Sequence, residues 1–211
     1  MTLTALNRFQ AFIIHLGLSL VIFAVLLLLI MQFWYPGFLF TTSGGWDAVQ
    51  LIIGVDLILG PLLTLLVFNP KKASLKKDLS VIALVQTLAL AWGTYTIFDT
   101  RPIALGFFNN EFVTLYAGNP ITDQNRALIA QSDSTPALLY YDMRHGDYGD
   151  PAAMSLITPD NLQALGHLQH IKREETDNGQ WLISLDSTFK RNQVLVFDPD
   201  TAQVTGLKTE R

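Results

Sequence analysis

Residues 11–35, AFIIHLGLSLVIFAVLLLLIMQFWY, decide the fold of this chain of 211 residues. The run contains no Asp, Glu, Lys or Arg, and about 20 apolar residues are enough for a helix to cross the hydrocarbon core of a bilayer. A cleaved signal peptide is the alternative, but its apolar region is only about 7–15 residues long and is followed by small residues. This run is longer and ends in Phe33-Trp34-Tyr35. It therefore predicts an uncleaved membrane-spanning helix that ends in an interfacial aromatic belt.

Two more apolar runs follow, at about 48–68 and 79–98, and a short basic loop at 69–78 separates them. Basic loops stay in the cytoplasm, whereas the loop near 41–47 has no Lys or Arg. The pattern predicts a cytoplasmic N-terminus and, from Asp99 onward, a domain on the far side of the membrane, which in a Gram-negative cell is the periplasm. Three buried helices of a soluble protein are the alternative, which the scarcity of charge disfavours. The loop's lysines are expected to set the topology and contact anionic membrane lipids: Lys71, Lys72, Lys76 and Lys77.

The second part of the chain has the composition of an ordinary globular domain. The net charge of the whole chain is -4, and no basic patch points to nucleic acid. The absence of cysteine excludes disulfides, thiolate metal sites and thiol redox chemistry. The domain must therefore be held by its own core, or by docking on the membrane part or on a partner.

Short apolar runs and turn residues outline an α+β domain at 99–211. Strands are expected at 102–108, 111–117, 137–142, 181–185, 194–197 and 203–207, and helices at 121–131 and from Thr158-Pro159-Asp160 to about 172. The Asn109-Asn110 pair is suited to a hairpin turn. This order predicts a mainly antiparallel sheet. The expected domains are thus a membrane domain with three transmembrane helices at 1–98 and an extracytoplasmic α+β domain at 99–211.

Asp56 lies inside the second apolar run, where a carboxylate costs roughly 2.5–3.5 kcal/mol on insertion scales. Asp56, Gly60 and Thr64 are spaced four apart, so they share one helix face, and a small residue there lets another helix approach closely. Pro61 has no N–H, which frees the carbonyl of Leu57 and favours a kink. Three interpretations stay open: a hydrogen-bonded packing residue, a contact for a partner helix, and part of a proton path. At a similar depth, Ser19, Gln86 and Thr87 are the candidates to pair with Asp56.

Patterns for catalysis or for a cofactor are weak in this sequence. A membrane aspartyl protease needs two facing carboxylates, and the other candidate, Asp78, is expected to cap the third helix. His167 and His170 could share a helix face, but no carboxylate stands at ligand spacing beside them. The acidic, Gly-rich segment 143–151 does not have the ligand pattern of an EF-hand. Phosphate-binding and dinucleotide-binding fingerprints are missing, so we expect no enzyme activity, no metal and no cofactor.

Two stretches resemble a known family. Residues 55–72, VDLILGPLLTLLVFNPKK, run on to LKKDL at 75–79, and Arg101-Pro102-Ile103 leads into Asn110-Glu111-Phe112. This order resembles the type IV pilin accessory protein family (TfpX/TfpZ), inner-membrane proteins of Gram-negative bacteria. The motif match covers about residues 45–118. That family commonly has an Asp-Arg-Phe-like triplet where this chain has Asn110-Glu111-Phe112, so no role for the arginine carries over.

The resemblance implies a non-enzymatic accessory or chaperone-like protein that binds type IV pilin and supports pilus assembly and surface display. Under that reading, Asp56, Gly60, Pro61 and Thr64 are expected to form a lateral dock for the pilin helix. The alternatives are a periplasmic ligand-sensing or transporter-associated subunit, and a membrane enzyme whose active site lies in the periplasmic domain.

Overall fold

The structure is a computed structural model that describes residues 6–108, 111–141, 154–162, 174–187, 189–190 and 192–209. It divides into two compact units. The helical unit contains Met1–Phe33 and Gly45–Phe98, and the sheet unit contains Trp34–Gly44 and Asp99–Arg211. The segment 34–44, which the sequence places with residues 1–98, thus groups with the second part of the chain.

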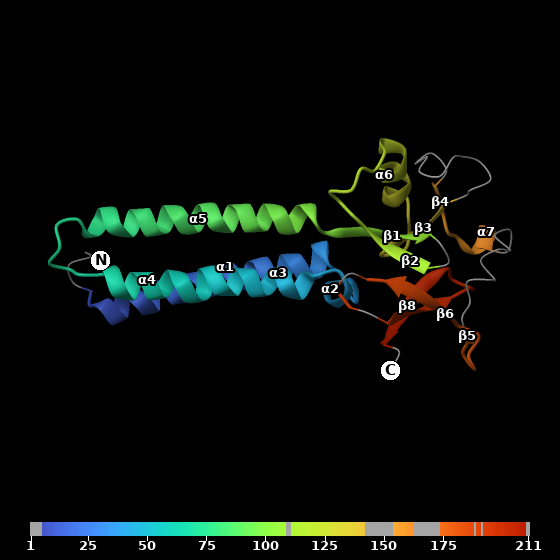
Figure 1. Cartoon of the computed structure of the whole chain (residues 1–211), viewed down its shortest axis with the longest axis horizontal. Helices are drawn as coiled ribbons and strands as arrows, with labels where there is room; N and C mark the ends of the chain where they lie inside the picture. Colours follow the sequence, from blue (N-terminus) through green and yellow to red (C-terminus); the bar gives the residue numbers. More distant parts are fainter. Residues whose placement is uncertain are drawn as a thin grey trace. The chain divides into compact units, whose positions relative to one another are not determined.

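The helical unit is built from long apolar helices (Figure 1). Helix α1 (Arg8–Leu29) continues into the π-helix η2 (Ile30–Trp34), and α5 (Leu75–Asp99) is continuous. Between them, α3 (Gly45–Ile52), the π-helix η3 (Ile53–Leu59) and α4 (Gly60–Val67) form one rod. The described residues thus contain 3 helices that are long and apolar enough to cross a membrane, which confirms the three predicted helical runs.

Local sequence explains where these helices begin and how they are joined. At the start of α1, the Gln10 N–H donates to Asn7 Oδ1 at 2.8 Å, and the Asn7 N–H donates to Gln10 Oε1 at 3.0 Å. This reciprocal pair satisfies amide groups that the first turn leaves without helical partners. Beside the lysine loop, Phe68 and Leu75 pack with Ala11 in a small apolar cluster. The cluster ties the start of α5 to α1 and α4.

The sheet unit contains an 8-stranded sheet whose main path has the order β4-β3-β1-β2-β6-β7-β8, with β5 paired to β6. The strands are β1 (Pro102–Phe108), β2 (Glu111–Tyr116), β3 (Ala137–Tyr141), β4 (Met154–Leu156), β5 (Glu174–Glu175), β6 (Trp181–Asp186), β7 (Gln193–Asp198) and β8 (Gln203–Thr209). Helix α6 (Asp123–Ala130) precedes β3, and α7 (Pro159–Leu162) follows β4. The predicted continuation of α7 to residue 172 and the Asn109-Asn110 turn lie outside the described residues.

The sheet is mixed, so the predicted mainly antiparallel arrangement is wrong. Strand β3 is parallel to β1, and β6 is parallel to β2. The connection through α6 carries the chain from β2 past β1, and a helical crossover of this kind allows a parallel pairing. The β2–β6 pairing joins strands that are distant in sequence, and no local pattern encodes such a contact.

Alternation along β1 and β3 gives the sheet two apolar faces. Leu105 and Leu138 lie in the main core, which also contains Phe112 and Phe197. Their neighbours Ala104, Ala137 and Leu139 form a second cluster, against which Leu128 and Ile129 of α6 pack. A face lined with alanine lets the helix lie close to the strands.

Segment 34–44 is an integral part of the sheet unit. Leu39, in the short helix α2 (Leu39–Thr42), is 1% exposed and belongs to the main core. The Tyr35 hydroxyl donates to the carbonyl of Thr100 at 3.0 Å, and Ser187 Oγ donates to the carbonyl of Thr42 at 2.6 Å. The sheet unit is therefore assembled from two segments of the chain.

We predict that Leu39→Ala lowers the free energy of unfolding of the sheet unit by about 2–5 kcal/mol, because it removes a fully buried side chain and leaves a cavity. Pulse proteolysis of the full chain in increasing urea, detected through a C-terminal tag, measures this change. Thr41→Ala, at an exposed position of the same helix, is the control. Equal stability of the two variants would contradict the role given to Leu39.

Candidate functional site

Asp56 lies in a π-helical segment between two α-helical segments of the same rod. The carboxylate lies within η3, where the Gly60 N–H donates to the carbonyl of Val55, five residues earlier. Pro61 follows in the first turn of α4 and has no N–H to continue the hydrogen-bond ladder. Short π-helical segments of this kind are frequent at functional sites. The predicted kink takes the form of a local π-helix before the proline.

All members of the predicted dock are buried, namely Asp56, Gly60, Pro61 and Thr64. Asp56 is 7% exposed and Thr64 is 4% exposed, although the helices around them expose many large apolar side chains outward. The helix face predicted from their spacing is thus an inward face. Its role in binding a partner stays a prediction.

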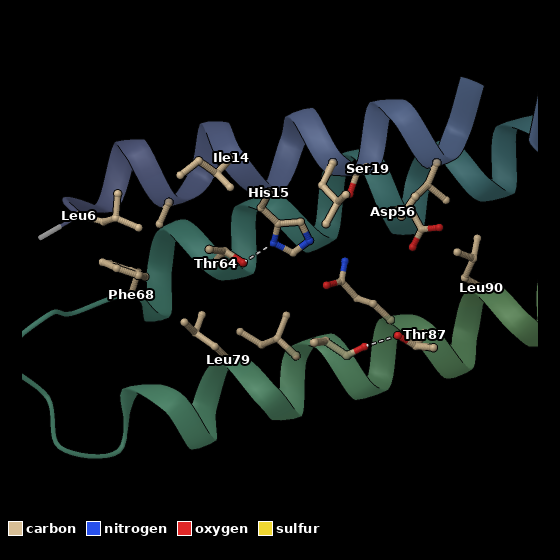
Figure 2. A pocket seen from close by; sticks show the side chains of 16 residues that line it. Leu6, Ile14, His15, Ser19, Asp56, Thr64, Phe68, Leu79, Thr87 and Leu90 are labelled. Carbon is tan, nitrogen blue, oxygen red and sulfur yellow. Dashed lines mark hydrogen bonds between the residues drawn. The ribbon is translucent and has the colours of Figure 1, made fainter. Parts of the chain in front are cut away.

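Asp56 and Thr64 line a pocket of about 380 Å³ inside the helical unit, which we call the polar groove. Figure 2 shows that Asp56, His15 and Thr64 point into a space faced by Thr87 and Leu90 of α5. Each wall is one helix face with a repeat of three or four residues. The lining residues are Leu6, Ala11, Ile14, His15, Leu18, Ser19 and Ile22 from the N-terminal end and α1; Asp56, Thr64 and Phe68 from the middle rod; and Leu79, Ile82, Ala83, Gln86, Thr87 and Leu90 from α5.

The polar groove brings together the side chains that the sequence proposed for Asp56, namely Ser19, Gln86 and Thr87. None of the described residues donates a hydrogen bond to the Asp56 carboxylate. Thr87 Oγ1 instead donates to the carbonyl of Ala83 in its own helix, at 2.8 Å. The structure therefore confirms that these residues lie around one pocket, but it does not pair them with Asp56.

Sequence reasoning missed the contact of His15, whose Nδ1 lies 2.6 Å from Thr64 Oγ1 (Figure 2). His15 also lies close enough to Asp56 for an electrostatic interaction. The signal that could have found this contact is geometric. Helices α1 and α4 run in opposite directions, and Thr64 lies two turns beyond Asp56, so it falls near the depth of His15 on the facing helix.

Gly60 marks the close approach of α5 to the middle rod. A Cβ added to Gly60 would collide with the side-chain amide of Gln86. Gln86 therefore rests on the bare backbone of Gly60 and crosses the polar groove. Alanine at this position could be accommodated by movement of the flexible Gln86 side chain, but a branched side chain would fill part of the groove.

All four lysines of the lysine loop are exposed. One of them, Lys72, forms a salt bridge, with its Nζ 2.5 Å from Asp78 Oδ2. The expected capping role of Asp78 is wrong, because α5 already begins at Leu75 and Asp78 lies inside its first turn. There Asp78 accepts hydrogen bonds from Lys72 and from Ser74 Oγ.

The described part of the sheet unit contains no group of three or more His, Asp or Glu side chains placed to hold a metal ion. Segment 143–151 and the pair His167 and His170 lie outside the described residues.

Comparison with known proteins gives a family. The chain is 37% identical over 114 residues to the fimbrial assembly protein of serogroups C1 and C2 from Dichelobacter nodosus, covering 53% of this chain and 86% of that protein. The chain belongs to the family of fimbrial assembly proteins. It is also 37% identical to the serogroup I member and 36% identical to the serogroup E1 member from the same organism, each over 114 residues.

These matches span only part of the longer relatives. The aligned region covers 44% of the length of the serogroup I protein and 44% of the serogroup E1 protein, so the chain spans less than half of either. No protein-family model and no solved structure matches the chain. Membership of the fimbrial assembly family supports a role in pilus assembly.

We predict that Thr64→Val lowers the free energy of unfolding of the helical unit by about 0.5–1.5 kcal/mol, because it leaves the half-buried His15 Nδ1 without its partner. Unfolding in a detergent titration, followed by far-ultraviolet circular dichroism, measures the loss. Thr87→Val is the matched control, since that hydroxyl bonds within its own helix. A Thr64→Val protein as stable as Thr87→Val would show that the His15–Thr64 contact contributes nothing.

Proposed function

We propose that this protein is an inner-membrane accessory protein of the type IV pilin accessory kind, which binds pilin and supports assembly and surface display of the pilus. The observation that carries the proposal is its membership of the fimbrial assembly family. The helical unit adds a physical reason, because its 3 apolar helices fit a multi-pass membrane protein. A pilin subunit waiting in the same membrane would meet these helices from the side.

The proposed topology places the N-terminus and the lysine loop in the cytoplasm and the sheet unit in the periplasm. Exposed Lys71, Lys76 and Lys77 support this orientation, because positive loops remain on the cytoplasmic side and attract anionic lipids. In this topology the sheet unit lies in the periplasm, where its surface could touch the pilin head.

The absence of native cysteine allows a direct test of this topology. We predict that a membrane-impermeant maleimide, added to intact cells with a permeabilised outer membrane, labels Asp177→Cys but not Ala73→Cys. Both positions are exposed. Labelling of Ala73→Cys only after the inner membrane is opened completes the expected pattern, and the reverse pattern would invert the topology.

The proposed dock for the pilin helix is the face that carries Asp56, Gly60, Pro61 and Thr64. A buried carboxylate inside an apolar helix faces a bundle interior or a partner, and here it faces the polar groove. Gly60 has no side chain, so the Gln86 side chain lies close to its backbone. Pro61 lies at the start of α4, just after the π-helix that contains Asp56.

We predict that Asp56→Ala and Gly60→Leu each reduce in-cell crosslinking of a tagged copy to pilin at least tenfold, measured by mass spectrometry of the purified complex. Leucine at Gly60 would enter the space of Gln86. Gly54→Leu is the matched control in the same rod, because a Cβ there meets nothing within 4 Å.

The outcomes separate the dock from the function. If both variants capture pilin like the wild type at normal expression, the dock lies elsewhere on the protein. If the wild type itself brings down no pilin from cells rich in pilin, the proposed function fails.

A further inference from the structure

We propose that the polar groove receives an apolar helix of the partner that carries a cationic group, an amine or a guanidinium, and that this group pairs with Asp56 while α5 swings outward. This inference rests on the proposed function, since it takes pilin as the partner. It goes further by assigning the chemistry of the bound group and the wall of the groove that moves.

Asp56 identifies the chemistry of the occupant. Its side chain is 7% exposed and points into the polar groove. The sequence contains no Lys or Arg from residue 9 to residue 70 or from residue 78 to residue 100. The nearby basic group is His15, which interacts electrostatically with Asp56 but makes its hydrogen-bond contact with Thr64 instead. Charged groups within membranes pair with one another, and Asp56 has no hydrogen-bonded cation among the described residues, so we assign that role to a cationic group of the occupant.

The size of the groove sets a second requirement. A helix with its side chains is about 10–12 Å across, and a pocket of about 380 Å³ accommodates a few side chains rather than a helical segment. The α5 wall extends from Leu79 to Leu90, roughly 16 Å at 1.5 Å per residue. A helix that uses this length must therefore widen the groove.

The packing identifies α5 as the wall that moves. In its most apolar stretch 6% of the residues are buried, against 11% in the span formed by α1 and η2 and 33% in the middle rod. The Phe68–Leu75–Ala11 cluster holds its start, and the Gln86 side chain rests on Gly60 further along. Displacing Gln86 breaks no hydrogen bond between described residues and exposes the bare Gly60 backbone to the incoming helix.

The first test tethers α5 in the closed position. In the double variant Gly60→Cys/Gln86→Cys, a short bis-methanethiosulfonate reagent joins two thiols that are the only ones in the chain. We expect the tether to reduce capture of pilin in detergent at least tenfold and reduction with dithiothreitol to restore it. A tether at the anchored end of α5, in Ser74→Cys/Asp78→Cys, whose side chains lie 3.3 Å apart outside the groove, is expected to leave capture unchanged.

The second test separates charge from hydrogen bonding. Asp56→Asn keeps the size and the polarity of the side chain but removes the charge, and we expect it to reduce pilin capture at least tenfold. Asp56→Glu keeps the charge and is expected to retain a larger share of capture than Asp56→Asn.

A photoreactive benzoylphenylalanine at Ile82, which lines the groove, is expected to label pilin. The same probe at Val85, which is 59% exposed on α5, is expected to label lipid.

The results that overturn the inference differ from those that overturn the function. Capture by the tethered protein equal to that of the untethered protein rules out movement of α5. Capture by Asp56→Asn equal to wild type rules out a cationic partner. Lipid as the only product at Ile82 assigns the groove to an acyl chain.

If the untethered double variant captures nothing while the wild type does, the pair Ser19→Cys/Thr87→Cys, which also lines the groove, replaces it. If the wild-type protein itself captures no pilin, the proposed function is wrong.

Discussion

The burial of one carboxylate, that of Asp56, constrains the whole helical unit. A carboxyl group in an apolar rod must turn inward, and the faces that meet around it carry polar side chains from the long helices. His15 and Ser19 of α1 and Gln86 and Thr87 of α5 all line that pocket. The remaining helix surface is apolar and exposed, as it is in a protein whose solvent on that side is lipid. The burial of Asp56 is therefore by itself a sufficient reason for the polar groove to exist.

The sheet unit depends on a different constraint, which is that a cysteine-free domain must be closed by its own packing. Part of that packing comes from segment 34–44, where Leu39 fills the main core and Thr42 accepts from Ser187. The connection between the first two long helices is thus a structural element of the sheet unit. Cutting the chain after the third helix would remove this element, so the isolated segment 99–211 lacks a piece of its own core.

The sequence predicts local features well because local chemistry decides them. The three helices, the α6 helix and most strands follow from apolar runs, periodicity and turn residues. The inward face of Asp56, Gly60 and Thr64 follows from their spacing. What it could not predict depends on contacts between distant segments: the parallel β2–β6 pairing, the insertion of Leu39 and the contact of His15 with Thr64. The prediction that Asp78 caps the third helix failed although it rested on local sequence, because α5 begins at Leu75, before Asp78.

The backbone around Asp56 shows how neighbouring residues place the carboxylate. In η3 the Gly60 N–H reaches the carbonyl of Val55, five residues earlier. Pro61 has no N–H, so it cannot continue this hydrogen-bond ladder, and the rod returns to an α-helix in α4. The same short segment thus ends the π-helix about one turn after Asp56 and leaves the Gly60 backbone bare where Gln86 approaches it.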